Sequence, residues 1–589
     1  MLPNPLSSPD WLIAQEAEKR MKTIFQLAEE LNIKEEELIP YGRYIAKIDF
    51  GKLYNRIKDN PNGKYIIVTA ITPTPFGEGK STTTIGLTQG FGKKGKKVSC
   101  AIRQPSAGPL MNIKGSAAGG GLSQCIPRNE FSIGFTGDIN AVTNAHNLAM
   151  VAITSRMLHE ANYPDEILKK RGLKRLDIDP KKVQMGWVID FCAQALRKIV
   201  IGLGGKKDGV TMESRFDIAT SSELMAILSL ARDLRDLKER INNIVVAYSR
   251  DGRPITTKDL EVSGAMCALM LSAINPNLIQ TIEGQPVFVH AAPFANIAIG
   301  QSSIIADMIG LKLSDYHITE AGFGADIGFE KFCNIKCRIS ELKPDAAVLV
   351  TTLRALKYHG GDRNAPKIIP GNPLPKDYFE KNIQWLERGM RNLFHHIKII
   401  EKFGLNMVVC LNRFLTDTSE EIEFIKKYCK EIGVPLAVSE HWEKGGEGAL
   451  ELVELVMEAC KRGSKFRFLY ESRLPHISKI EKIAREIYGA DSVEFSPLAL
   501  DKLQSINEKK EFEDFSVCIA KTHLSLSDNP NLKGVPEGWQ LFIKDILVFH
   551  GAKLIVPVAG EINLMPGTAS NPNFKAIDID LKTGRVIGI

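Results

Sequence analysis

The chain of 589 residues contains no apolar run that approaches the roughly 18 residues of a membrane-spanning helix. Its first ten residues have no basic segment followed by an apolar one, so they do not resemble a secretory signal. The ten cysteines form no paired framework, and no second pair or histidine completes a zinc site around Cys333 and Cys337. These absences predict a soluble cytoplasmic protein with reduced thiols and no membrane partner.

Neither basic nor acidic residues predominate in the chain. The 76 basic and 69 acidic residues leave a net charge of +7, which is nearly balanced for this length. The richest basic run, Lys93-Lys94-Gly95-Lys96-Lys97, has the composition of a solvated turn before a strand. We therefore expect no nucleic-acid partner.

The amino-acid composition of the chain is that of a folded globular protein. Hydrophobic residues make up 44% and charged residues 25%, which excludes wholesale disorder and a collagen-like or small disulfide-rich protein. At roughly 150 residues per domain the length predicts about four units, or fewer large ones. Residues 9–60 have helical spacing of apolar positions, and Asp10 is placed to cap the first helix.

From Lys64 onward, short apolar runs alternate with amphipathic helical stretches, which predicts parallel strands crossed by helices in an α/β core. The predicted strands are 65–70, 98–101, 244–246, 287–290, 346–350 and 407–411. The run 346–350 has almost no polar interruption, as expected of a strand buried on both faces. Stretches 360–375 and 461–475 are candidate boundaries between units.

The most specific signal follows the strand at 65–70. Residues 72–84 read Thr-Pro-Thr-Pro-Phe-Gly-Glu-Gly-Lys-Ser-Thr-Thr-Thr, and the second half fits the phosphate-loop pattern G-x-x-x-x-G-K-[ST], with Thr74 at the first glycine position. In such loops backbone N–H groups point at phosphate oxygens, the lysine neutralises them and the hydroxyl can ligate Mg²⁺. The alternative is an ordinary glycine-rich turn. The predicted phosphate-binding residues are Thr74, Gly77, Glu78, Gly79, Lys80, Ser81 and Thr82.

Two nearby features are compatible with the same ligand. Six of the eight residues in 114–121 are Gly or Ala, so the backbone around Gly119 and Gly120 can approach an anion closely. A flexible loop explains this composition equally well. Arg103 follows the strand at 98–101, where α/β folds place ligands, and its guanidinium suits phosphate or carboxylate. Taken alone, a single arginine is more often a surface residue.

Glycine also punctuates the segments 294–298, 319–328 and 352–361, each of which follows a strand. They line the same cleft or form ordinary turns, and local patterns do not separate the two. Phe414 follows another strand and Trp442 precedes Gly445-Gly446. Either ring can stack on a flat heterocycle, although isolated aromatic residues usually belong to the core.

Taken together, these segments resemble the formate–tetrahydrofolate ligase family, also called 10-formyltetrahydrofolate synthetase. The motifs stand in the family's order and at its approximate spacing from about residue 45 to the C-terminus. They are 72–84, 114–121, Phe-Thr-Gly-Asp at 135–138, 294–298, 320–328, 354–361, 442–448 and Lys-Thr-His-Leu-Ser-Leu-Ser-Asp at 521–528. Coincidence over so many segments is very improbable.

The resemblance implies an ATP-dependent carbon–nitrogen ligase of one-carbon metabolism. Formate would be phosphorylated to formyl phosphate, and N10 of tetrahydrofolate would attack it to give 10-formyltetrahydrofolate, ADP and phosphate. Such catalysis rests mainly on positioning and electrostatic stabilisation. The implied cofactors are ATP, Mg²⁺, tetrahydrofolate as substrate, and a monovalent cation. The implied roles are Lys80 on phosphate, Arg103 on the acyl phosphate, Asp138 on the amine proton, Ser81 on Mg²⁺, and Phe414 with Trp442 around the pterin.

Several positions depart from the family pattern. Gln104 stands where the family usually has a Glu linked to monovalent-cation activation. Leu122 replaces a usual Tyr, and Gly134, Asn140 and Ile299 replace usual His residues. Each lost hydrogen bond costs on the order of 1 kcal/mol, so affinity for formate would fall.

These departures leave three interpretations open. In the first, the chain is a formate ligase in which neighbours such as His146 or His290 compensate. In the second, it is a paralogous acyl-phosphate-forming ligase with another carboxylate or another amine acceptor. In the third, it is a nucleotide-binding protein without ligase activity, and the intact phosphate loop and Arg103 speak against this one.

The predicted architecture is α/β: a large phosphate-loop domain with a mostly parallel sheet at 1–365, and two smaller α/β domains. The second unit, 366–462, would carry the pterin-stacking aromatics, and 463–589 would form the C-terminal unit, with the active site in the cleft between them. Bacterial family members of this length are commonly homotetramers, so the resemblance also implies a homo-oligomer.

Overall fold

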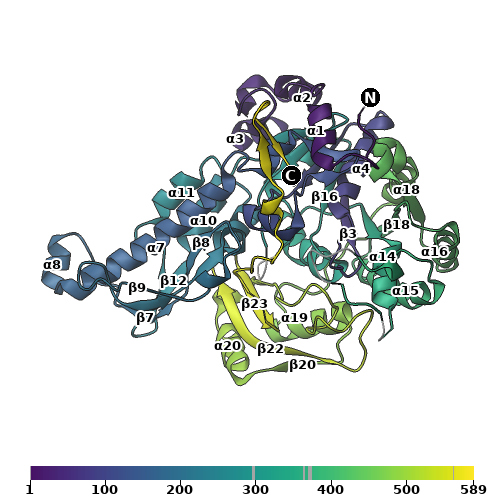
Figure 1. Ribbon diagram of the computed structural model, residues 1–589. Coiled ribbons are helices and arrows are strands. Elements are labelled where there is room, and N and C mark those ends of the chain that lie inside the picture. The colour runs from purple at the N-terminus through teal and green to yellow at the C-terminus, as the bar shows by residue number, and fades with distance from the viewer. Residues whose placement is uncertain (1, 295–298, 363–364, 369–373, 562) are drawn as a thin grey trace.

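The computed structural model describes residues 2–294, 299–362, 365–368, 374–561 and 563–589. A 12-stranded sheet forms its centre, with β5 (Gly119–Gly120) and β6 (Ser123–Ile126) attached beside the main path (Figure 1). The main path is β1 (Leu38–Pro40), β2 (Ala46–Ile48), β14 (Asn277–Thr281), β15 (Pro286–Val289), β4 (Val98–Ile102), β16 (Tyr316–Glu320), β3 (Lys64–Ala70), β17 (Ala346–Thr351), β18 (Asn406–Asn412) and β19 (Leu436–Ser439). From β15 to β19 every neighbouring pair is parallel, which confirms the predicted fold class.

Helices cover both faces of the parallel part because its strands are apolar on both sides. Alternate residues of β3, β17 and β18 pack in one cluster against α4 (Lys80–Lys93) and α18 (Leu450–Lys461). The intervening residues pack in a second cluster against α14 (Leu353–Gly360), α15 (Ile383–Lys402) and α16 (Ser419–Glu431). Every residue of β17 is buried, as predicted for a strand covered on both faces.

The predicted strands all form, with ends that differ by one or a few residues; the one not yet named is β12 (Val245–Ser249). The helix-rich N-terminus is also confirmed, as α1 (Asp10–Glu18), α2 (Ile24–Glu30) and α3 (Phe50–Ile57). The predicted capping role of Asp10 is wrong, because Pro9 is the N-cap residue of α1. The Asp10 carboxylate instead accepts a 2.8 Å hydrogen bond from the backbone N–H of Gly121, which ties this helix to the glycine-rich segment.

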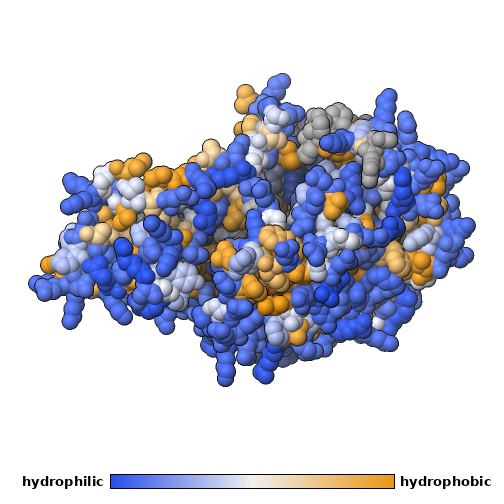
Figure 2. Space-filling model, turned by 90° about the horizontal axis from the view of Figure 1, so that it is seen from below, coloured by the Kyte–Doolittle hydropathy of each residue, from blue (hydrophilic) through white to orange (hydrophobic). Residues whose placement is uncertain are grey.

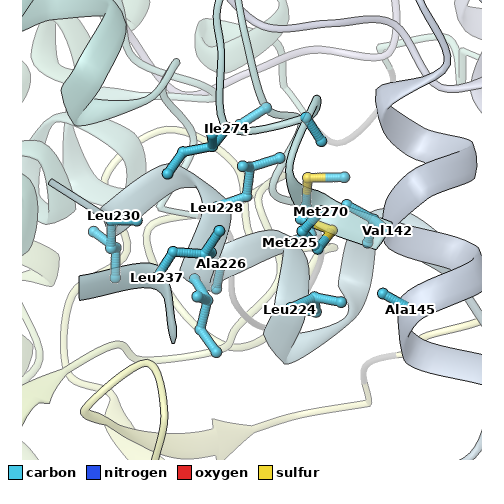
Figure 3. Packing of buried hydrophobic residues seen from close by; sticks show 14 of the residues in the cluster. Val142, Ala145, Leu224, Met225, Ala226, Leu228, Leu230, Leu237, Met270 and Ile274 are labelled. Atoms are coloured by element: carbon cyan, nitrogen blue, oxygen red, sulfur yellow. The ribbon is translucent and has the colours of Figure 1, made fainter. Parts of the chain in front are cut away.

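A middle lobe extends to one side of the sheet (Figure 1). It comprises α7 (Asp138–Asn162), α8 (Asp165–Lys170), β7 (Ile178–Val183), β8 (Trp187–Ile189), β9 (Ile199–Ile201), β10 (Met212–Ser214), β11 (Phe216–Ile218), α9 (Glu223–Leu230), α10 (Leu234–Asn242), β12, β13 (Pro254–Thr256) and α11 (Ser263–Met270). Helix α9 is apolar at nearly every position, and its side chains meet those of α7, α10 and α11 in one core (Figure 3). α12 (Ile304–Leu313) belongs to the same core.

The C-terminal unit contains a four-stranded sheet of β20 (Ser492–Phe495), β22 (Gln540–Phe549), β23 (Leu554–Ala559) and β21 (Ser516–Val517), with α19 (His476–Ile483) and α20 (Pro497–Asn507). Seen from below, this face carries a central apolar patch within a polar surround (Figure 2). The chain then returns through β24 (Asp578–Asp580) and β25 (Arg585–Ile587), where Gln15 of α1 donates a hydrogen bond to the Val586 carbonyl at 2.9 Å. The two ends of the chain therefore lie side by side.

Strands β18 and β19 fall in the predicted second unit, 366–462, and lie in the same sheet as β3 and β17. The predicted boundary at 360–375 includes residues 363–364 and 369–373, which lie outside the described residues. The domain limits therefore stay a prediction. None of the described helices has the length and apolar content to cross a membrane.

Candidate active site

The predicted phosphate loop joins the end of β3 to the start of α4, as its pattern requires. Gly77 and Gly79 have φ angles of +77° and +76°, in the left-handed region that favours glycine. A Cβ atom on Gly79 would collide with the side-chain amide of Asn412, so close packing also requires glycine there. Thr82 lies in the first turn of α4, half-buried. The loop therefore presents the N-terminus of a 14-residue helix at the edge of the sheet.

A buried carboxylate organises the inside of the loop. Glu78 accepts hydrogen bonds from the backbone N–H and the hydroxyl of Thr74, at 2.6 and 2.9 Å. Burial raises the pKa of Glu78, and the Lys80 ammonium 3.6 Å away opposes that effect. Thr74, which stands where the pattern has its first glycine, therefore stabilises the loop, because its hydroxyl and its N–H both bond to Glu78.

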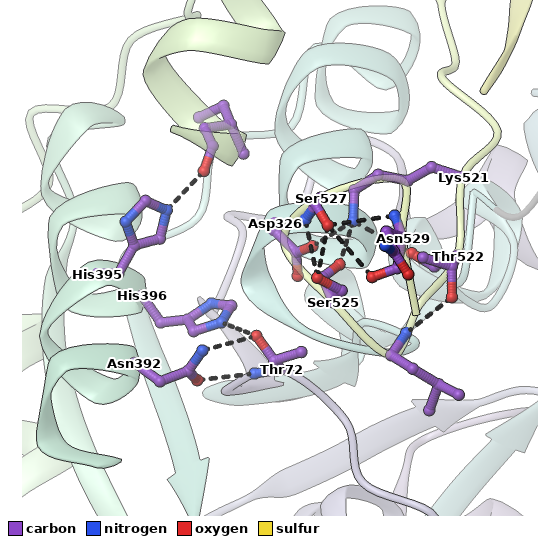
Figure 4. A network of polar contacts seen from close by, with 12 residues as sticks. Thr72, Asp326, Asn392, His395, His396, Lys521, Thr522, Ser525, Ser527 and Asn529 are labelled. Carbon is purple, nitrogen blue, oxygen red and sulfur yellow. Dashed lines mark hydrogen bonds and ion pairs between the residues drawn. The ribbon is translucent and has the colours of Figure 1, made fainter. Parts of the chain in front are cut away.

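Side chains of α15, shown in Figure 4, and one side chain of α14 hold the start of the loop. The Asn392 amide bonds both the hydroxyl and the N–H of Thr72, at 3.0 and 3.3 Å. His396 Nε2 lies 2.9 Å from the same hydroxyl, and His359 Nε2 lies 2.8 Å from the Thr72 carbonyl. The first residue of the loop is thus fixed on three sides by the layer of helices beneath it.

Glu320 links two residues that the sequence predicts to bind phosphate. It ends β16, which lies between β3 and β4, and its carboxylate accepts a 2.6 Å hydrogen bond from the Ser81 hydroxyl. Its other oxygen lies 3.6 Å from Nε of Arg103, which follows β4. The carboxyl ends of parallel strands are where α/β folds place ligands. Sequence reasoning did not assign Glu320 a role, although its position at the end of a strand was a usable signal.

Positive charge gathers at this edge. The pKa of Lys114 is lowered to about 8, first by desolvation and then by the positive charges of Arg103 and Lys80. Its ammonium lies 4.7 Å from the ring centre of Phe294 and 5.7 Å from that of Phe323. Lys80, Arg103 and Lys114 therefore act on one another electrostatically, and an anion bound among them would relieve their repulsion. The rest of the predicted segment, 295–298, lies outside the described residues.

The C-terminal segment reaches the same edge. The His523 ring lies 4.6 Å from that of Phe323, and burial together with nearby lysines lowers the pKa of His523 to about 3. Two residues earlier, the buried Lys521 ammonium donates to Asp326 at 3.0 Å and to the Ser525 carbonyl at 2.6 Å (Figure 4). The segments 319–328 and 521–528 are thus in contact, as one shared cleft requires.

Gly119 and Gly120 pack against protein atoms. A Cβ atom on Gly119 would collide with the Ser123 carbonyl and reach the side chain of Ile85 in α4. One on Gly120 would lie 3.3 Å from Nε1 of Trp442. The glycine run is therefore needed for close packing between α4 and Trp442, and its predicted contact with phosphate stays a prediction.

The two predicted pterin-stacking residues come from neighbouring strands. Phe414 follows β18, and Trp442 lies in α17 (His441–Lys444) after β19. The guanidinium of Arg354 lies 3.9 Å from the ring centre of Phe414, so it occupies one face of that ring. Trp442 accepts a hydrogen bond from the Leu122 N–H at 2.7 Å through its carbonyl, which fixes its backbone.

Asp138 begins α7 and is buried in a fully partnered position. One carboxylate oxygen lies 2.6 Å from Nζ of Lys47, and the other accepts a 2.7 Å hydrogen bond from Asn277. Burial lowers the pKa of Lys47, and Asp138 opposes that effect. A role for Asp138 in proton transfer requires one of these partners to give way.

The positions that depart from the family pattern have different surroundings. Gln104 is buried, and its side-chain oxygen has no hydrogen-bond partner among the described residues. Ile299 is 1% exposed and belongs to the main apolar core. Of the suggested compensating residues, His290 has both ring nitrogens engaged, with Ser303 and the Ala273 carbonyl, each at 2.6 Å. His146 lies in the middle lobe, bonded to the Gly186 carbonyl at 2.9 Å.

Comparison with known proteins identifies the family of the chain. Residues 8–589 match the family model described as formate–tetrahydrofolate ligase. The chain is 82% identical over 589 residues to a formate–tetrahydrofolate ligase of Thermodesulfovibrio yellowstonii, with 100% of both chains covered. It is 59% identical over 590 residues to that of Desulforapulum autotrophicum, covering 100% of this chain and 99% of the relative. The chain therefore belongs to the formate–tetrahydrofolate ligase family.

Proposed function

We propose that the edge formed by the phosphate loop, Glu320, Arg103 and Lys114 is where ATP phosphorylates formate in the family's reaction. The observation that carries this proposal is the bridge from Ser81 through Glu320 to Arg103, at 2.6 and 3.6 Å. It places a hydroxyl, a carboxylate and a guanidinium around the start of α4. Lys80 and the loop backbone would hold the phosphates, and Arg103 would hold the acyl phosphate.

Ser81 and Glu320 also suit Mg²⁺, because a hydroxyl and a carboxylate are oxygen ligands of the kind it prefers. When bound, Mg²⁺ would neutralise charge on the phosphate oxygens of ATP. The Ser81–Glu320 hydrogen bond holds both ligand oxygens on the same side of the loop before any metal arrives. We therefore add Glu320 to Ser81 as a proposed Mg²⁺ ligand.

For a monovalent cation, the proposed ligand is the side-chain oxygen of Gln104. This oxygen is buried without a hydrogen-bond partner among the described residues, beside Arg103. An amide oxygen can ligate K⁺, but it supplies no negative charge to offset desolvation of the ion. We expect activation by monovalent cations to be weaker here than in a variant with Glu at this position.

The pterin would bind near Phe414 and Trp442, which follow adjacent strands. Arg354 on one face of Phe414 leaves the other face for the heterocycle. Asp138 stays the candidate for the proton of N10, and its two carboxylate oxygens are engaged by Lys47 and Asn277. Proton transfer would therefore require one of these partners to move.

The alternative of a paralogue with another acyl or amine substrate has no supporting observation. An 82% identity over the whole chain to a relative named formate–tetrahydrofolate ligase favours formate. All ten cysteines are thiols in the part of the chain that the structure describes, which suits the proposed cytoplasmic location. A homotetramer, as the family resemblance implies, completes the proposal.

The direct test is ADP release by the purified protein with Mg-ATP and tetrahydrofolate, with and without saturating formate. We expect formate-dependent ADP in a 1:1 ratio with 10-formyltetrahydrofolate. ADP release that does not respond to formate would overturn the assignment of the substrate. A screen of small carboxylates would then identify the true acyl donor.

A further inference from the structure

A cavity of about 460 Å³ lies away from the phosphate loop, between the middle lobe and the C-terminal unit. Its walls come from β8, β11, α9 and β12 on one side and from α20 and β22 on the other. Lys80, Arg103 and Glu320 do not line it. The volume falls in the range of roughly 300–1,000 Å³ that is typical of sites for small molecules.

The walls are mostly apolar, with several rings. Tyr248 and Phe549 line the cavity together with Phe512 and His550, whose rings meet edge-on at 5.4 Å. Burial raises the pKa of Tyr248 and lowers that of His550, so both rings are neutral near pH 7. Flat apolar walls of this kind favour a ligand that places a planar ring between them.

Two carboxyl groups, Asp217 and Glu223, belong to the polar part of the cavity, which also includes His146, Gln184, Arg215, Ser221, Ser222, Lys502, Ser505, Lys509 and Glu511. Glu223 accepts hydrogen bonds from the N–H groups of Gly551 and Ala552 with one oxygen, at 2.8 and 3.1 Å. Asp217 pairs with Nε of Arg215 through one oxygen, at 3.1 Å. In both, the second oxygen is left without a protein hydrogen bond among the described residues. Burial raises the pKa of both groups, that of Glu223 to about 8, so the Glu223 carboxyl is mostly protonated at pH 7.

Hydrogen bonds within the protein fix the wall of the cavity. Arg240 donates to the carbonyls of Gly551 and Ala552, at 3.3 Å each, while Glu223 binds the N–H groups of the same turn. The turn after β22 is thus fixed to α9 and α10. Behind the cavity, Leu224 packs into the dense core of the middle lobe (Figure 3). A preformed site of this kind does not need to be ordered when a ligand binds.

We infer that this cavity binds a planar heterocycle that carries amino or ring N–H groups and an anionic substituent. The second oxygen of Asp217 would accept one of its N–H groups, and the second oxygen of Glu223 would donate a hydrogen bond to a ring nitrogen. The rings of Tyr248, Phe512 and His550 would cover its faces. Lys509, exposed at the rim, would pair with the anionic substituent. Adenine nucleotides and folates share this chemistry, so each is a possible source of the ligand.

The test is calorimetric titration of the full-length protein with ADP and, separately, with 5-formyltetrahydrofolate. We expect one of these two compounds to bind with two equivalents per chain. That compound shows whether the ligand of the cavity is an adenine nucleotide or a folate. Ser505→Trp, on the exposed surface of α20 at the rim, should abolish the second equivalent by filling the mouth of the cavity. Asp217→Asn should weaken it about tenfold, because a charge-assisted hydrogen bond is lost.

Asp501→Asn is the matched control, since Asp501 is an exposed carboxylate on α20 that does not line the cavity. It should leave both equivalents unchanged. The first equivalent should keep its affinity in all three variants, which verifies that each is folded. A single equivalent for both probes with the unmodified protein would overturn the inference, and so would a second equivalent undiminished in Ser505→Trp.

Discussion

The hydroxyl of Ser81 donates a 2.6 Å hydrogen bond to the carboxylate of Glu320, across 239 positions of sequence. The contact arises because β3 and β16 are adjacent parallel strands, with Val68 paired with Glu320. The loop after β3 and the end of β16 must therefore meet at one edge of the sheet. Glu320 is thus placed to act on whatever the phosphate loop binds.

Glu320→Gln should lower formate-dependent turnover on the order of 100-fold, because the neutral amide cannot balance the charge of Mg²⁺ or of Arg103. The concentration of Mg²⁺ that gives half-maximal rate should rise as well. Asp315→Asn, an exposed carboxylate just before β16, is the control and should change neither quantity. An unchanged dependence on Mg²⁺ in Glu320→Gln would remove Glu320 from the proposed ligands.

Lys80→Ala should lower phosphoryl transfer by three orders of magnitude or more, because the cation nearest the loop is lost. It also leaves Glu78 buried without its ion-pair partner, so Lys80→Ala should be compared with Lys80→Ala/Glu78→Gln. If the double variant binds ADP again but has no turnover, the unpaired charge of Glu78 accounts for the loss of binding, and the missing Lys80 accounts for the loss of phosphoryl transfer. Lys93→Ala, in the last turn of α4, serves as the control. Undiminished turnover in Lys80→Ala would refute the assignment of the loop.

The sequence predicts the local parts of this site better than the distant ones. Apolar runs predict β3, β17 and β18 because buried strands are continuous in sequence, and the phosphate loop is read from one short segment. Glu320, Lys114 and His523 acquire their roles only when the sheet brings separate segments together. The Asp10 prediction failed because a capping residue type alone does not say where the first turn of a helix begins.

The lowered pKa of Lys114 predicts a pH dependence. Because this pKa is about 8 instead of 10.5, the ammonium is charged at pH 7 and loses its charge as pH rises through 8. KM for ATP should therefore rise several-fold between about pH 7 and pH 9. Lys114→Arg should remove most of this rise, since arginine stays charged throughout that range. The same pH profile in both proteins would show that another group titrates.

The buried pair of Lys521 and Asp326 should contribute to stability far more than an exposed pair. Both side chains are 0% exposed, so Asp326→Asn leaves a buried ammonium without its counter-charge and should cost about 3–5 kcal/mol. The control is Lys398→Met at the exposed pair with Glu401, where about 1 kcal/mol or less is expected. Urea denaturation of both variants measures the difference. Equal costs would mean that the ion pair between these two segments contributes no more to stability than an exposed pair.

Ile299 and Leu122, which stand where the family usually has His and Tyr, allow the effect of these two lost polar side chains to be tested. Ile299 lies in the core, so Ile299→His should destabilise the fold by about 1–3 kcal/mol through an unpartnered buried ring, while Ile299→Val should cost less. Leu122 is half-buried beside Trp442, so Leu122→Tyr should fold normally. We expect KM for formate to change less than threefold in Leu122→Tyr, because Lys80, Arg103 and Glu320 supply the charges that act on the acyl phosphate. A tenfold gain in formate affinity would instead show that loss of the tyrosine had retuned the pocket.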